Sequence, residues 1–217
     1  MFQKESMSTV STISGTQIID GIEYNEYPAP DSLIKAMESV WAMQLIAQGN
    51  IRLSPLSYYQ NLESDELGDN LEGLGELQIN SHPYATSSIN EIFVWCCANP
   101  ETEFSRLLSL DNAYDVIIQI TNPVEFVNRI STALRDNNYR FSHPHVGRVN
   151  YNRSDEVTID RLQEQMWHWN TFQKSASYEH QNEFRIVLSD LSFTLARGEA
   201  INLSIGNCED IIELIET

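Results

Sequence analysis

The apolar residues of this chain lie in short segments, and their shortness is what most constrains the fold. Segments with the composition of β-strands occur at 75–79, 91–98, 115–120, 147–151, 183–188 and 200–204. Helical patterns occur at 123–136, around 160–172, and after Asn207, which can cap a C-terminal helix. Connections of hairpin length are mixed with longer helical ones. We therefore predict a single α+β domain with a mixed, mostly antiparallel sheet and flanking helices.

The N-terminal part of the chain carries a hairpin pattern and the clearest helical pattern. Apolar and polar residues alternate over 16–27 around an Asp-Gly turn, which predicts a hairpin. A helix capped by Asp31 or Ser32 is predicted to end at Gly49, and a short strand at 51–53 is predicted to follow. The helix is predicted because apolar residues recur at intervals of three and four: Leu33, Ile34, Met37, Val40, Trp41, Leu45 and Ile46.

Length and charge limit the domain organisation and the classes of partner. A chain of 217 residues suits one domain, and we predict a flexible tail at 1–14, rich in Ser and Thr, and a folded domain at 15–217. The formal net charge is −18, which repels nucleic-acid phosphates and anionic lipids. General nucleic-acid binding is therefore not expected. A local group of cationic side chains can still hold one phosphate of a nucleotide. The composition is also compatible with an unknown protein target.

The cysteines and the apolar runs bear on the compartment. Of the three cysteines, Cys96 and Cys97 are adjacent within the longest apolar run, 92–98. They cannot form a paired disulfide framework, and the chain has no CxxC spacing of the kind that binds zinc. The run is too short to cross a bilayer, and the N-terminus lacks the apolar core of a signal peptide. We expect a cytoplasmic protein with no membrane span and no metal.

The stretch YEHQNEFRIVL, residues 178–188, joins polar groups to the beginning of an apolar strand. Alternation along a strand would place Gln181, Glu183 and Arg185 on one face and the apolar residues on the other. A carboxylate held near a guanidinium can hold a sugar hydroxyl or stabilise a developing cation. The same arrangement is also that of an ordinary cross-strand ion pair, and the spacing alone favours the ion pair.

Arg52 and Tyr58 are the candidate ligand-binding residues earlier in the chain. Arg52 lies between apolar residues in IRLSPL, so its guanidinium can grip a phosphate or carboxylate, or pair with an acid of the following loop. Tyr58 and Tyr59 follow on a predicted helix. We expect one ring to pack in the core and the other to line a cleft, where it could stack on a base or nicotinamide.

The order of these motifs from Gln48 to Leu188 resembles that of a broad set of uncharacterised bacterial proteins. The motifs that carry the resemblance are G-D-x-x-E-G at 68–73 and a lysine followed by E-x-x-x-E-aromatic-R, which ends at Arg185. The resemblance implies a shared fold and cleft but no specific activity.

The chain also resembles, more weakly, ADP-ribosyltransferases of the arginine, Ser-Thr-Ser, Gln/Glu-x-Glu type. Arg52 matches the arginine that holds NAD, and Gln181-x-Glu183 matches the last motif. The resemblance implies that Glu183 is catalytic and that Gln181 orients the acceptor, in an NAD-consuming transferase or glycohydrolase of toxin, anti-phage or phage-effector type. Tyr58 and Arg185 would complete the site for NAD. The middle motif departs from the family, because Phe-Val-Trp-Cys-Cys at 93–97 stands in place of Ser-Thr-Ser.

Two alternatives of other classes remain open. The net charge of −18 suits an acidic inhibitor or nucleic-acid mimic that binds a basic site on another protein without catalysis. Asp69, Glu72 and Glu183 could instead serve a metal-dependent nuclease or hydrolase, although Arg185 stands where such a site would place a lysine.

Overall fold

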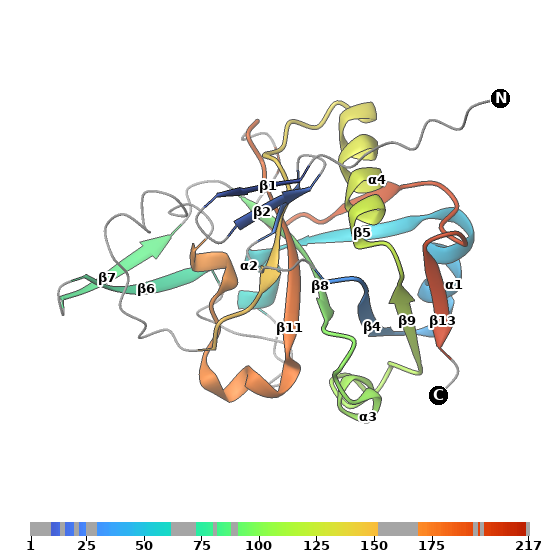
Figure 1. Cartoon of the computed structure of the whole chain (residues 1–217), viewed down its shortest axis with the longest axis horizontal. Helices are drawn as coiled ribbons and strands as arrows, with labels where there is room; N and C mark the ends of the chain where they lie inside the picture. Colours follow the sequence, from blue (N-terminus) through green and yellow to red (C-terminus); the bar gives the residue numbers. More distant parts are fainter. Residues whose placement is uncertain are drawn as a thin grey trace.

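One large sheet with helices packed against it organises the chain (Figure 1). The computed structural model describes residues 10–13, 16–19, 22–24, 30–61, 73–79, 82–87, 91–151, 169–192, 195 and 198–215. The helices are α1 (Ser39–Gln48), α2 (Leu56–Gln60), α3 (Phe104–Leu108) and α4 (Pro123–Asp136), with 3-10 helices η1 (Trp169–Phe172) and η2 (Ala176–Gln181). The strands are β1 (Val10–Ile13), β2 (Thr16–Ile19), β3 (Ile22–Tyr24), β4 (Leu33–Met37), β5 (Asn50–Pro55), β6 (Leu74–Ile79), β7 (His82–Ser87), β8 (Ile92–Ala98), β9 (Val116–Ile120), β10 (His145–Arg148), β11 (Glu183–Ser189), β12 (Ile201–Ser204) and β13 (Ile212–Ile215).

The large sheet has 11 strands among the described residues and is almost wholly antiparallel. Its main order is β1-β2-β3-β10-β11-β8-β4-β9-β13, and β5 joins β8 to β12 at one side. Among the described strand pairs only β3 and β10 are parallel, while β6 and β7 form a separate two-stranded sheet. This topology confirms the predicted single α+β domain. Ile19 lies opposite Ile22 in an antiparallel pair, which confirms the predicted hairpin.

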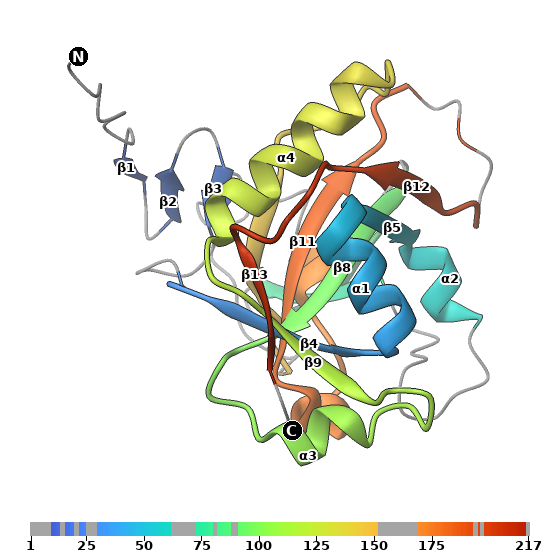
Figure 2. The same ribbon diagram turned by 90° about the vertical axis from the view of Figure 1, so that its right-hand side faces the viewer.

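Side chains of β8 and β11 alternate between two faces of the sheet, and both faces are buried. Phe184, Ile186 and Leu188 lie in the main core, together with buried residues of α1 and α4 such as Phe126. Val187 lies on the other face, in a smaller cluster that includes Leu56 of α2. Figure 2 shows α1 and α4 against the sheet. Glu183 and Arg185 alternate in step with Val187, so the polar end of β11 continues the face of the smaller cluster.

The beginning of one predicted helix and part of another are strands in the structure. Residues 33–37 form β4, and helix α1 begins only at Ser39, although it ends at Gly49 as predicted. In β4, Leu33 packs in the main core and Ile34 in a cluster on the opposite face, so the apolar residues serve a strand buried on both sides. The segment after Asn207 likewise forms β13 rather than a helix. A short apolar run can form either a helix or a strand. Both β4 and β13 pair with β9, and this pairing favours the strand in each segment.

The predicted N-terminal tail and the predicted helix around 160–172 are described only in part. Of the predicted tail at 1–14, residues 10–13 form β1, which pairs with β2, and the rest lies outside the described residues. Of the predicted helix around 160–172, only η1 is described. Among the described residues, no helix has both the length and the apolar character needed to span a membrane.

Candidate functional site

The polar end of β11 is positioned by a sharp change of backbone direction between η2 and the strand. Gln181 is the last residue of η2, and Asn182 has a positive φ of 43° before β11 begins at Glu183. Asn tolerates this left-handed conformation better than most residues, and its side-chain Nδ2 donates to Thr102 Oγ1 at 2.8 Å. Gln181 therefore reaches the side of Glu183 by a turn, whereas the sequence predicted an extended chain. Glu179, on the same 3-10 helix, is exposed.

The Glu183 carboxylate is the centre of a buried ion cluster. Its Oε1 accepts from Arg185 Nε at 2.7 Å and its Oε2 accepts from Arg185 Nη2 at 3.2 Å, so the guanidinium binds it with two donors. Lys174 Nζ lies 2.8 Å from Glu183 Oε2 and donates to Gln181 Oε1 at 2.7 Å. These four residues are between 1% and 6% exposed. An ion pair is therefore present as expected, but it lies within β11 rather than across two strands, and a lysine and a glutamine join it.

Backbone groups lock this cluster in place. Arg185 Nη1 donates to the Thr171 carbonyl oxygen at 2.5 Å, which ties β11 to η1. The Glu183 backbone N–H donates to Tyr151 Oη at 2.8 Å, and the Glu183 carbonyl accepts from the Val149 N–H at 3.0 Å. The Arg185 guanidinium is therefore fixed by η1, and the Glu183 backbone by the segment after β10.

The charges of the cluster keep Glu183 ionised. Burial alone would raise the pKa of this carboxyl, but Arg185 and Lys174 outweigh burial and hold the pKa well below its usual range. Because the charge of Glu183 is already shared by two cations, it does not stand free to attract a further one. A substrate cation would have to approach the Glu183 carboxylate oxygens from a side that Arg185 and Lys174 do not occupy.

Neutral hydroxyl and thiol groups surround the carboxylate. Burial, with the negative charge of Glu183 adding to it, raises the pKa of the Cys96 thiol to about 12 and raises the pKa of the Tyr151 hydroxyl. Burial also raises the pKa of Tyr59, whose Oη lies 3.9 Å from Cys96 Sγ. At neutral pH these groups are protonated, so they can donate hydrogen bonds near Glu183 but are poor nucleophiles.

Arg52 and Tyr58 form a separate pair at the surface. Both are exposed, Tyr58 by 38%, and Arg52 Cζ lies 5.5 Å from the centroid of the Tyr58 ring. This is a cation–π distance, and it leaves the guanidinium accessible to an anion.

Tyr59 connects the two groups. Arg52 and Ser54 share a face of β5 by alternation, and Ser54 lies opposite Val94, which packs in the smaller cluster with Tyr59. Tyr59 contacts Cys96, which lies opposite Arg185 in the register of β8 and β11. Arg52 and the ion cluster therefore lie on one face of the sheet with Tyr59 between them. Of the two adjacent tyrosines, Tyr59 packs against the smaller cluster and Tyr58 is exposed to solvent.

The structure adds residues to the site to which the sequence analysis gave no role, including Lys174, the lysine that precedes the E-x-x-x-E-aromatic-R motif. Lys174 is the most informative, because it joins Gln181 to Glu183. One sequence signal could have identified it: Lys174 is the sole Lys or Arg between Arg161 and Arg185. Cys96 contributes through its position on β8, which the sequence could not place beside β11 without the register.

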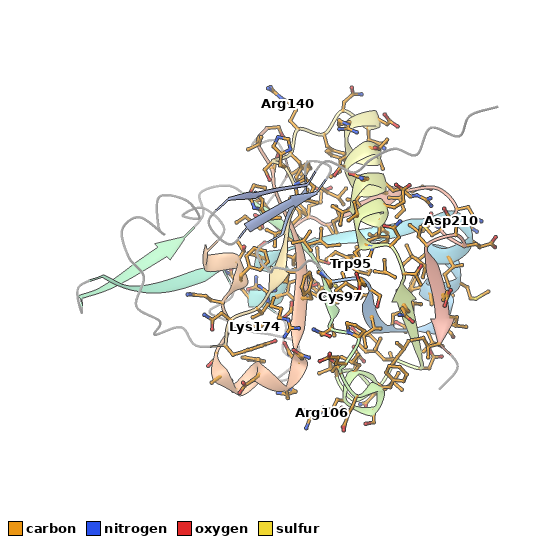
Figure 3. The ribbon with its side chains drawn as sticks, in the orientation of Figure 1. Trp95, Cys97, Arg106, Arg140, Lys174 and Asp210 are labelled. Atoms are coloured by element: carbon orange, nitrogen blue, oxygen red, sulfur yellow. The ribbon has the colours of Figure 1, made fainter. Side chains whose placement is uncertain are left out.

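Asp69 and Glu72, which the nuclease alternative would use as metal ligands, lie outside the described residues. Within the part of the chain that the structure describes, no group of three His, Cys, Asp or Glu side chains is arranged to hold a metal ion. A hollow of about 440 Å³ lies elsewhere, between α4 and the segment 204–206, and its lining includes Glu125 and Arg129. Arg129 also binds Asp210, which Figure 3 shows on the far side of the molecule from Lys174.

Comparison of the chain with protein-family models, with curated protein sequences and with solved structures finds no match in any of the three.

Proposed function

We propose that this protein cleaves the bond between nicotinamide and ribose in NAD, as an ADP-ribosyltransferase or NAD glycohydrolase. The observation that carries the proposal is that Gln181 and Glu183 converge on one ammonium group, Lys174 Nζ, at 2.7 and 2.8 Å. This convergence gives the Gln-x-Glu motif a fixed geometry, on the sheet face that also carries Arg52. The resemblance to transferases with an early arginine and a late Gln/Glu-x-Glu supplies the chemistry.

In the proposed reaction the C–N bond to nicotinamide breaks, and nicotinamide leaves with the bonding electrons. The ribose carbon becomes cationic, and the ionised Glu183 stabilises it. Water or a nucleophilic group of a target protein then bonds to that carbon and loses a proton. Gln181 orients the acceptor, while Arg52 pairs with the diphosphate and Tyr58 stacks on an aromatic ring of NAD.

Arg185 has a different role here from the direct NAD contact expected from the sequence. It is 1% exposed and donates to Glu183 and to the Thr171 carbonyl, so in this proposal it positions Glu183. Glu183 is itself 6% exposed, and the reaction therefore requires that NAD binding opens access to its carboxylate. We place the reaction in the cytoplasm, because the three cysteines are free thiols, as is usual in a reducing compartment.

The second candidate function is non-catalytic binding of a basic partner by an acidic chain. The formal net charge of −18 favours it, because such a charge accelerates encounter with cationic surfaces. In this case the ion cluster is purely structural.

Release of nicotinamide from NAD by the purified protein, alone and with cell extract, tests the proposal. We expect release by the wild type and a loss of about 100-fold or more in Glu183→Gln. Glu179→Gln is the matched control, because it makes the same chemical change at an exposed position outside the cluster. Assays are run below the melting temperature of each variant. No release by the wild type under either condition, or equal release by the two variants, would contradict the proposal and favour the binding function.

A further inference from the structure

Helix α1 exposes an uncharged, apolar surface. The helix contains no Asp, Glu, Lys or Arg, and Ala42 and Leu45 fix its buried side in the main core. On its outer side Val40 is 50% exposed, Trp41 52% and Met43 56%. Isolated exposed apolar residues are common, but three apolar side chains that are each at least half exposed, on one helix without any charge, are typical of a binding surface.

Strand β13 lies beside α1 and extends this surface. Figures 1 and 2 both place β13 next to α1, and β13 ends the strand order of the sheet, with β9 as its single partner among the described strands. Leu214 is opposite Ile118 of β9, whose side chain lies in the main core that α1 covers. Leu214 therefore faces the α1 side, and it is 44% exposed. The other edge of β13 presents backbone N–H and C=O groups that can pair with a further strand.

The charge around this surface is negative. Glu209, Asp210 and Glu213 are exposed on and beside β13, and Asp115 is exposed at the N-terminal end of α1. Arg129 brings a positive charge to this group, but its guanidinium is already bound to Asp210 and Glu125. Segment 198–217 contains no Lys or Arg at all. A complementary partner must therefore combine apolar side chains with positive charge.

We propose that α1 and the free edge of β13 bind an extended segment of a partner protein in which apolar residues alternate with Lys or Arg. The segment adds to the sheet as a strand beside β13. Its apolar residues pack on Leu214 and Trp41, and its cationic residues face the acids beside β13. A second copy of this chain is a poor occupant, because two chains of net charge −18 repel each other. The surface lies apart from the ion cluster, so the inference does not depend on NAD cleavage.

A fluorescein-labelled peptide of about seven residues that alternates Lys and Val is the probe, and fluorescence anisotropy measures its binding to the full chain. A peptide with Glu in place of Lys tests the charge requirement, and a peptide with Pro at its centre tests strand addition, because Pro cannot donate to the ladder. We expect binding of the Lys-Val peptide alone, weakening as salt increases. Trp41→Ala and Leu214→Lys should each weaken it by about tenfold or more.

Leu191→Ala is the matched control, because Leu191 is 45% exposed and lies next to Arg140, which Figure 3 shows away from Asp210. It should bind the peptide like the wild type. Equal affinity for the Lys and Glu peptides, or undiminished binding by both surface variants, would overturn the proposal. No binding of the Lys-Val peptide would also overturn it. A dimer in sedimentation velocity that Trp41→Ala dissociates would overturn it in favour of a second copy of the chain.

Discussion

Replacement of Arg185 by Met should be among the most destabilising single changes in this protein. Arg185 is 1% exposed and supplies two hydrogen bonds to Glu183 and one to the Thr171 carbonyl. Methionine fills a similar volume but leaves the buried carboxylate with Lys174 as its remaining described cation. Breaking a buried pair in this way costs about 3–5 kcal/mol, against a total stability of about 5–15 kcal/mol for a domain.

The pH dependence of this loss identifies its cause. In the wild type, the lowered pKa of Glu183 means that its ion pairing stabilises the fold above its unfolded pKa of about 4.3 and is lost as pH falls through the lower folded value. In Arg185→Met, burial meets less opposing charge, so the folded pKa of Glu183 rises. The carboxyl then takes up a proton more readily in the folded state. The deficit relative to wild type should therefore be largest at pH 7 and shrink toward pH 4.

Urea unfolding followed by far-ultraviolet circular dichroism, at pH 7 and pH 4, measures both effects. Arg106→Met is the matched control, because Arg106 is largely exposed and its ion pair with Glu103 spans 3.9 Å. It should change the free energy of unfolding by less than about 1 kcal/mol. The reasoning would be refuted if Arg185→Met cost no more than this control, or if its deficit were the same at both pH values.

Further predictions concern other parts of the fold. Gly49→Ala should lower the free energy of unfolding by at least about 2 kcal/mol, because φ is +69° and the new Cβ would lie 2.0 Å from the Gly206 carbonyl oxygen. Gly198 has a similar φ of +83° but open space around it, so Gly198→Ala should cost about 1 kcal/mol in the same urea assay. Asn122→Ala should cost about 1 kcal/mol, because the Asn122 side chain accepts from the Glu125 N–H at 3.0 Å and caps α4, and an unchanged urea midpoint would contradict this. Cys96 should resist iodoacetamide at pH 8 in the folded protein and react in urea, since its pKa is raised to about 12 in the folded state. Mass spectrometry that found Cys96 alkylated in the folded protein would contradict this prediction.

The two faces of β11 could be predicted from the sequence because polar and apolar residues alternate at the start of the strand. Glu183 and Arg185 share one face and Phe184 lies on the other, as alternation requires. The order of α1 and β4 could not be predicted in the same way. Residues 33–37 are apolar at helical intervals, and only pairing with β9 makes them a strand.

The residue that completes the cluster could not be found by periodicity. Lys174 reaches Glu183 because η2 folds the intervening chain back, and the left-handed Asn182 redirects it into β11. Neither step leaves a periodic pattern in the sequence. Gln181 joins the cluster through the same turn, so its predicted proximity to Glu183 is realised by a geometry that differs from the expected strand extension.

Comparison of two variants separates a catalytic Glu183 from a structural one. Glu183→Gln and Arg185→Met break the same ion pair, so both should lower stability, and stability alone cannot distinguish the roles. Only Glu183→Gln removes the carboxylate that would stabilise a cationic ribose carbon. If Glu183 is catalytic, then at a temperature where both variants are folded, Arg185→Met should retain far more nicotinamide release than Glu183→Gln. Equal losses in the two variants would mean that release depends on the integrity of the cluster, and the catalytic carboxylate would then have to be sought elsewhere on the chain.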